Sequence, residues 1–121
     1  MKKIRDNVEQ ANVVLRKFKG ARFEMVSFSK PFNVIEVSLS FLDSDRIAFL
    51  TFSPCLYFRG NVFLSDVELR ISEDNGIIEI TDLKSDLNIK AKGGFVLKEG
   101  DTGEFFDDSK LPPMPDFPWE E

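Results

Sequence analysis

The chain has no histidine and only one cysteine, Cys55, among its 121 residues. Without histidine, Ser-His-Asp and Cys-His catalytic arrangements are impossible, and a zinc site would need carboxylates plus the one thiol. One cysteine cannot form an intramolecular disulfide, so we expect a protein of the reducing cytoplasm. Because Cys55 lies in an apolar run with no base nearby, we expect a buried thiol with a raised pKa that does not act as a nucleophile.

Long apolar runs are also missing. The basic start of the chain is followed by acidic and amide residues where a signal peptide needs an apolar core, so we expect no secretion signal. The most apolar segment, residues 47–58, is interrupted by Pro54 and is too short to cross a bilayer. We therefore expect a soluble protein without a membrane span.

The composition that remains is typical of a folded domain. Hydrophobic residues make up 42% of the chain and charged residues 31%, well away from the compositions that stay disordered. A chain of this length buries roughly two-thirds of its unfolded surface, which suits one core. We expect one domain, residues 1–100, and an acidic proline-rich tail, residues 101–121, that holds four of the six prolines.

The pattern of apolar residues predicts an α+β fold. Spacings of three and four predict one amino-terminal amphipathic helix, ended by Gly20, whose apolar stripe is Ile4, Val8, Ala11, Leu15 and Phe18. From Phe23 onward apolar and polar residues alternate, as in antiparallel sheets with one buried face. We expect the helix to pack on one twisted antiparallel sheet of six to eight strands. The expected strands lie near residues 23–28, 34–42, 46–53, 55–59, 62–72, 77–82, 87–92 and 95–98.

Turn signals account for most of the candidate chemistry. Carboxylate pairs at Asp43-Ser44-Asp45 and Glu73-Asp74 could serve acid–base catalysis or a metal, but turns select aspartate for local backbone hydrogen bonds. Asp74-Asn75-Gly76 is typical of a tight hairpin, and Pro54 should mark a strand break, a bulge or an edge. Gly93-Gly94 lacks the lysine and hydroxyl residue of a phosphate loop, so we expect a bend. We expect no enzyme activity and no cofactor.

Thirteen phenylalanines raise two further possibilities. Rings on a sheet can stack nucleic-acid bases, but residues 31–98 carry seven basic and ten acidic residues, a net charge of −3, which argues against a nucleic-acid face. We expect Phe41, Phe49 and Phe58 to lie in the core. The alternative is a phenylalanine-lined cavity in a half-barrel that binds a small apolar ligand or a lipid.

The two ends of the chain have opposite charge. Residues 1–30 hold eight basic and three acidic residues, whereas residues 99–121 hold one basic and eight acidic residues. Either the ends lie near each other or are merely solvated, or the acidic end meets a basic partner. The candidate partner-binding residues are four carboxylates and two aromatic anchors of the tail: Asp101, Glu104, Asp107, Asp108, Phe117 and Trp119.

The tail segment 111–119 combines prolines with large apolar residues, which suits either of two roles. An extended proline-rich backbone with aromatic anchors is typical of a recognition peptide. Alternatively, Phe117 and Trp119 pack back onto the surface of their own domain.

In its size, acidity, lack of catalytic residues and order of a helix followed by a β-meander, the chain resembles the small bacterial immunity-type proteins that neutralise a toxin. The resemblance is one of general type and carries no motif. It implies a non-enzymatic protein-binding module that occludes the cationic cleft of a basic partner with its carboxylates, in a fast and salt-sensitive encounter. The apolar-ligand module is the second hypothesis, and an enzyme that uses only carboxylates is the third.

Overall fold

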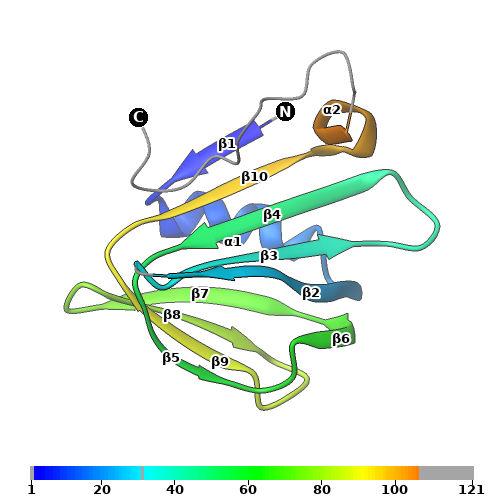
Figure 1. Ribbon diagram of the computed structural model, residues 1–121. Helices are drawn as coiled ribbons and strands as arrows, with labels where there is room; N and C mark the ends of the chain where they lie inside the picture. Colours follow the sequence, from blue (N-terminus) through cyan, green and yellow to red (C-terminus); the bar gives the residue numbers. More distant parts are fainter. Residues whose placement is uncertain (1, 31, 107–121) are drawn as a thin grey trace.

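The computed structural model describes residues 2–30 and 32–106 (Figure 1). These residues form ten strands and two helices. In chain order they are β1 (Lys2–Arg5), α1 (Val8–Arg16), β2 (Ala21–Ser29), β3 (Val34–Ser40), β4 (Arg46–Phe52), β5 (Cys55–Arg59), β6 (Phe63–Val67), β7 (Leu69–Asp74), β8 (Ile77–Asp82), β9 (Asn88–Lys92), β10 (Phe95–Asp101) and α2 (Thr102–Phe106).

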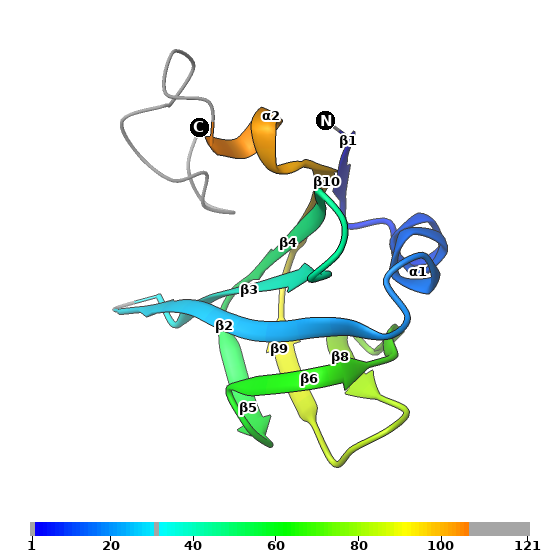
Figure 2. The ribbon, with the colours of Figure 1, turned by 90° about the vertical axis from the view of Figure 1, so that its right-hand side faces the viewer.

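The strands form two antiparallel sheets that share one core. The six-stranded sheet has the order β1-β10-β4-β3-β2-β6, and the four-stranded sheet has the order β5-β9-β8-β7. The chain crosses between the sheets at β4 to β5, β5 to β6, β6 to β7 and β9 to β10 (Figures 1 and 2). The α+β class and the antiparallel pairing are confirmed, but the expected single sheet of six to eight strands is wrong.

Two local features explain the extra strands. The first is β1, a four-residue strand that pairs with β10 and that the helical spacing had assigned to the helix. The second is Glu68, which divides the strand expected over residues 62–72 into β6 and β7. The backbone N–H of Glu68 donates to the Asp82 carboxylate (2.8 Å), so this residue leaves the sheet ladder.

The helix begins at Val8 rather than at residue 4 because Asp6 and Asn7 stop it on the amino-terminal side. Asp6 has a positive φ of 58°, and its carboxylate accepts a hydrogen bond from the Phe95 N–H at 2.7 Å. Asn7 is the N-cap, since its side chain accepts from the Gln10 N–H (2.9 Å). The predicted left-handed conformation of Gly20 is confirmed by its φ of 86°.

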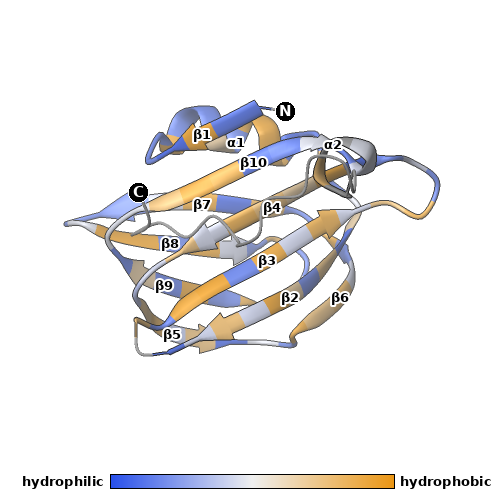
Figure 3. Ribbon diagram, turned by 45° about the horizontal axis from the view of Figure 1, so that its top comes forward, coloured by the Kyte–Doolittle hydropathy of each residue, from blue (hydrophilic) through white to orange (hydrophobic). Residues whose placement is uncertain are grey.

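Inward-facing residues of both sheets and of α1 fill the core. The largest fully buried side chains include Phe18, Phe23, Phe52 and Phe95. Phe41 and Phe58 pack against this core, as expected. Phe49 does not, because Ala48 and Leu50 are its inward-facing neighbours in β4. In Figure 3 hydrophobic and hydrophilic segments alternate along β3, as the sequence predicts for a sheet with one buried face.

The connections agree with the turn signals. Pro54 separates β4 from β5 at the corner between the sheets, and the Ser53-Pro54 peptide bond is cis. Asn75 and Gly76 both have positive φ in the β7–β8 hairpin. Gly93, with φ 112°, turns the chain from β9 into β10, and a Cβ there would lie 2.9 Å from the Ser53 carbonyl oxygen. The bend expected at Gly93-Gly94 is therefore confirmed.

Candidate functional site

The structure describes only part of the acidic segment proposed as a partner-binding site. Asp101 is exposed at the end of β10 and lies opposite Arg46 of β4. Glu104 belongs to α2, whose first N–H, at Thr102, donates to the Asp45 carbonyl (2.8 Å). β10 thus extends into the segment expected as tail, and α2 follows it. The remaining candidates, Asp107, Asp108, Phe117 and Trp119, lie outside the described residues.

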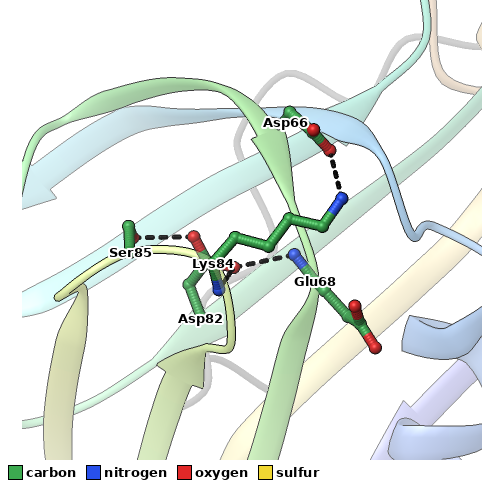
Figure 4. Close-up of polar contacts among 5 residues, drawn as sticks. All are labelled: Asp66, Glu68, Asp82, Lys84 and Ser85. Atoms are coloured by element: carbon green, nitrogen blue, oxygen red, sulfur yellow. Dashed lines mark hydrogen bonds and ion pairs between the residues drawn. The ribbon is translucent and has the colours of Figure 1, made fainter.

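Two buried carboxylates near the sheet ends have structural roles. Asp82 is 5% exposed and accepts hydrogen bonds from the backbone N–H groups of Glu68 and Lys84 and from the Ser85 hydroxyl (Figure 4). It therefore holds the β8–β9 connection against the start of β7. Glu99, 4% exposed, forms an ion pair with Arg46.

Lys84 belongs to the same group of polar contacts as Asp82, because its backbone N–H donates to the Asp82 carboxylate. Its ammonium group donates to the Asp66 carboxylate at 2.8 Å, and this hydrogen bond raises the pKa of Lys84 above its ordinary value (Figure 4). Nearby Glu68 and Asp82 raise the pKa further. The pair is exposed, so it adds little to stability.

Cys55 is half-buried at the start of β5, less enclosed than expected. Burial raises the pKa of its thiol, which confirms the predicted direction. A raised pKa means little thiolate at neutral pH, so Cys55 lacks the property that makes a cysteine reactive.

A hollow of about 320 Å³ lies between the β1–α1 connection, the β7–β8 hairpin and the β9–β10 bend. Its lining includes the carboxylates of Asp6 and Glu73. The Asp6 carboxylate already accepts a hydrogen bond from the Phe95 N–H. The backbone N–H of Asp6 in turn donates to the Phe95 carbonyl at 3.1 Å. Residues 2–30 and 32–106 contain no group of three or more cysteine or carboxylate side chains placed to hold a metal ion.

Large apolar side chains remain exposed on the side of the molecule opposite α1. We call this set the apolar rim; each member is between 47% and 56% exposed, and they are Val26, Phe28, Phe32, Leu56, Val62 and Phe63. Figure 2 shows the end of β2, β5 and the start of β6 together on this side, with α1 on the other. Figure 3 shows hydrophobic segments in β5 and β6.

Backbone hydrogen bonds join the segments that carry the apolar rim. The Met25 N–H donates to the Val62 carbonyl (2.8 Å), which brings the middle of β2 to the start of β6. The Cys55 N–H donates to the Asn33 carbonyl (2.9 Å), and the Ser53 hydroxyl donates to the Phe32 carbonyl (2.8 Å). The β2–β3 connection is thereby held against the start of β5. These hydrogen bonds bring the three parts of the chain that carry the rim close together.

Two exposed carboxylates, one on β2 and one on β6, lie near the rim. Glu24 lies opposite Phe63 in the β2–β6 pair, and Asp66 follows on the same strand. On the β5 side, the Lys90 ammonium lies 5.7 Å from the centre of the Tyr57 ring, and Tyr57 is itself 44% exposed. A patch that combines half-exposed aromatic and aliphatic groups with a charged border has the anatomy of a protein-docking surface.

Sequence reasoning missed the apolar rim, although a signal for it exists. Leu56-Tyr57-Phe58 and Val62-Phe63-Leu64 are runs of three consecutive apolar or aromatic residues. Successive side chains of a strand point to opposite faces, so each run must turn at least one such side chain outward. Phe58 and Leu64 pack against the core, and their neighbours form the exposed surface.

Comparison with known proteins adds no relative. No family model matches the chain, and neither the curated proteins nor the solved structures contain a match. In the described part of the chain, neither helix is long and apolar enough to span a membrane.

Proposed function

We propose that the chain is a non-enzymatic protein-binding module whose apolar rim docks a basic partner protein. The observation that carries this proposal is that six large apolar side chains stay about half exposed on neighbouring segments, where the end of β2, the start of β5 and the start of β6 lie close together. Single exposed apolar residues are ordinary, but a contiguous group of them is favourable only when a partner covers it. Aromatic side chains such as Phe28 and Phe63 are suited to anchor such an interface.

Charge favours a basic partner. The chain has a net charge of −5, and Glu24 of β2 lies opposite Phe63 at the rim. A negative protein attracts a positive one over distances near the Debye length, which raises the association rate and makes it depend on salt. This is the behaviour implied by the resemblance to immunity-type proteins, with inhibition of a cationic toxin as the specific form of the proposal. The acidic segment from Asp101 onward would add to the same attraction.

The alternative of a phenylalanine-lined ligand cavity draws less support. Phe18, Phe23, Phe52 and Phe95 fill the core between the sheets rather than line a void. The hollow of about 320 Å³ touches Phe95 alone among the phenylalanines, and its other walls include two carboxylates. A lining of that kind does not suit an apolar ligand or a lipid chain.

The proposal is tested with the product of the neighbouring gene, because immunity proteins are encoded beside their toxins. The two purified proteins should form a complex whose association slows as salt is added. Leu56→Ser and Phe63→Ser should each weaken binding by at least about tenfold, if these side chains act as hot spots. Leu42→Ser is the matched control, since Leu42 is 84% exposed in the β3–β4 connection and lies outside the rim.

Three outcomes would count against the proposal. A complex weakened equally by Leu42→Ser and Phe63→Ser would show that the rim is not the docking surface. Association that does not respond to salt would contradict a basic partner. If neither the neighbouring gene product nor any other protein from the source organism binds at low or high salt, the chain is not a protein-binding module.

A further inference from the structure

The face of the four-stranded sheet that points away from the core presents a row of polar and aromatic side chains. Ile71, Ile80 and Ile89 are paired neighbours in β7, β8 and β9, and they belong to the core. Because successive side chains of a strand point to opposite faces, the residues next to them point outward. Those that follow one another across β7, β8, β9 and β5, here called the polar row, are Ser72, Glu79, Lys90 and Tyr57.

Contacts within the sheet orient the polar row. The Asn88 side-chain amide donates to a carboxylate oxygen of Glu79 at 2.6 Å. The Lys90 ammonium lies 5.7 Å from the centre of the Tyr57 ring, which is 44% exposed. Glu79 is half-buried, whereas Ser72 and Lys90 are exposed. The row therefore offers a hydrogen-bond acceptor, a donor and an open aromatic ring in fixed order, over roughly 14 Å at the usual spacing of strands.

A hollow of about 270 Å³ continues the polar row at the β7–β8 hairpin. Its volume lies just below the range of sites for drug-sized molecules, so it suits a small ligand or one unit of a longer one. We call the row and the hollow together the polar strip. The hollow shares three residues with the row and adds three of its own: Ser72, Glu79 and Lys90, and then Asp74, Asn75 and Ile77.

We propose that the polar strip binds a saccharide. The hollow brings the carboxylates of Asp74 and Glu79 beside the Lys90 ammonium, so it offers neither an anion nor a cation a site of one sign. A hydroxyl group both donates and accepts, and it can therefore donate to Glu79 while it accepts from Lys90. Hydrogen bonds to charged groups are the stronger ones. The mixture of charges that disfavours a simple ion thus favours a ligand with many hydroxyl groups.

Tyr57 supplies the apolar part of the same recognition. The two faces of a sugar ring carry C–H groups, which pack against the negative face of an aromatic ring. Tyr57 stands at the β5 end of the strip, and Ile77 adds a half-buried apolar side chain in the hollow. Hydrogen-bonding groups flanked by apolar ones match an oligosaccharide, whose rings have apolar faces and hydroxyl-bearing edges.

The polar strip is independent of the proposed docking of a partner protein. It lies on the four-stranded sheet, whereas Phe28 and Phe63 of the apolar rim belong to the six-stranded sheet. The two surfaces adjoin at β5, where Leu56 belongs to the rim and Tyr57 to the strip. Variants of each surface therefore test the two proposals separately.

Nuclear magnetic resonance of the isotope-labelled full chain tests the proposal directly. The probes are short oligosaccharides of glucose, galactose, mannose, xylose and N-acetylglucosamine at millimolar concentration, with inorganic phosphate as the anion for comparison. At least one oligosaccharide should shift the backbone amides of Tyr57, Glu79 and Lys90 in a saturable manner, and phosphate should not. The proposal is overturned if no oligosaccharide shifts these amides, or if phosphate shifts them as strongly.

Variants separate recognition by the strip from binding elsewhere. Tyr57→Ala and Glu79→Ala should each weaken binding of the active oligosaccharide by at least about tenfold, while the remaining amide spectrum shows the fold intact. Tyr57→Phe is the matched control, because it keeps the ring and should keep most of the affinity. Phe63→Ser, in the rim, should leave saccharide binding unchanged. Equal affinities for Tyr57→Ala and Tyr57→Phe, or an equal loss in Phe63→Ser and Tyr57→Ala, would place the saccharide elsewhere and overturn the proposal.

Discussion

The side chain of Asn12 should contribute more to stability than any other polar group on α1. Its amide nitrogen donates to the Ile71 carbonyl and its amide oxygen accepts from the Ile71 N–H, both at 2.8 Å. β7 is an edge strand of the four-stranded sheet, so Asn12 occupies the position that a further strand would take. This pairing covers an edge whose backbone groups would otherwise be open to another chain.

The Asn12→Ala variant removes both hydrogen bonds at once. Each is worth about 1 kcal/mol net, and a partly buried N–H and carbonyl are left without partners. Alanine regains up to roughly 0.5 kcal/mol through its higher helix propensity. We expect the free energy of unfolding to fall by about 2 kcal/mol, which lowers the urea midpoint by about 1 M for a typical slope of roughly 2 kcal/mol per M.

Urea unfolding followed by circular dichroism measures this change, and hydrogen exchange at the Ile71 amide tests its origin. Gln10→Ala is the matched control, because Gln10 is an exposed amide on the same helix and should change stability by less than about 0.5 kcal/mol. If Asn12→Ala and Gln10→Ala have equal midpoints, or if exchange at Ile71 is not accelerated by Asn12→Ala, the argument from the paired amide is refuted.

Three further predictions follow from single contacts. Phe18 is 2% exposed and stacks on Phe41, with ring centroids 5.7 Å apart. Phe18→Ala should therefore lower the free energy of unfolding by about 3–5 kcal/mol, measured by thermal or chemical unfolding. A loss below roughly 1 kcal/mol would contradict the place of Phe18 in the core. Gly94→Ala should lower the free energy of unfolding by about 1–3 kcal/mol, because the added Cβ would lie 2.7 Å from the Asp6 carboxylate and displace this carboxylate from the Phe95 N–H. An unchanged melting temperature would show that the hydrogen bond between Asp6 and Phe95 does not stabilise the fold. The raised pKa of Cys55 keeps its thiol protonated at neutral pH. A thiol reagent should therefore label the native protein more slowly than the unfolded protein, and the labelling rate should rise toward higher pH. Equal labelling rates for the native and unfolded protein would contradict the effect of burial.

The parts of the fold that depend on local signals could be predicted from the sequence. Alternation places Ile35, Val37 and Leu39 on one face, and all three are buried. The hairpin at Asn75-Gly76 and the strand break at Pro54 need only local backbone chemistry, and both are present. Such features involve few residues and short separations, so the pattern alone is sufficient.

The parts that depend on distant contacts could not be predicted. Ile4 has the spacing of a helical stripe, yet it lies in a strand, because the Asp6 carboxylate meets an N–H that is 89 residues away in the chain. The division into two sheets has the same cause, since it depends on which strands pair. Of the candidate site, Asp107, Asp108, Phe117 and Trp119 lie outside the described residues. The rim depends on segments of β2, β5 and β6 that come together only in the folded chain.

The position of β10 in the six-stranded sheet has a consequence for how the chain folds during synthesis. β10 lies between β1 and β4 in the six-stranded sheet, so β1 has no partner strand until β10 has been made. Contacts of such long separation slow folding, because the loop between them must close first. Shortened chains that lack β10 would leave β4 with an open edge and β1 without its partner in the six-stranded sheet. The protein therefore has no stable half, and truncation upstream of residue 101 should yield aggregation rather than a smaller folded domain.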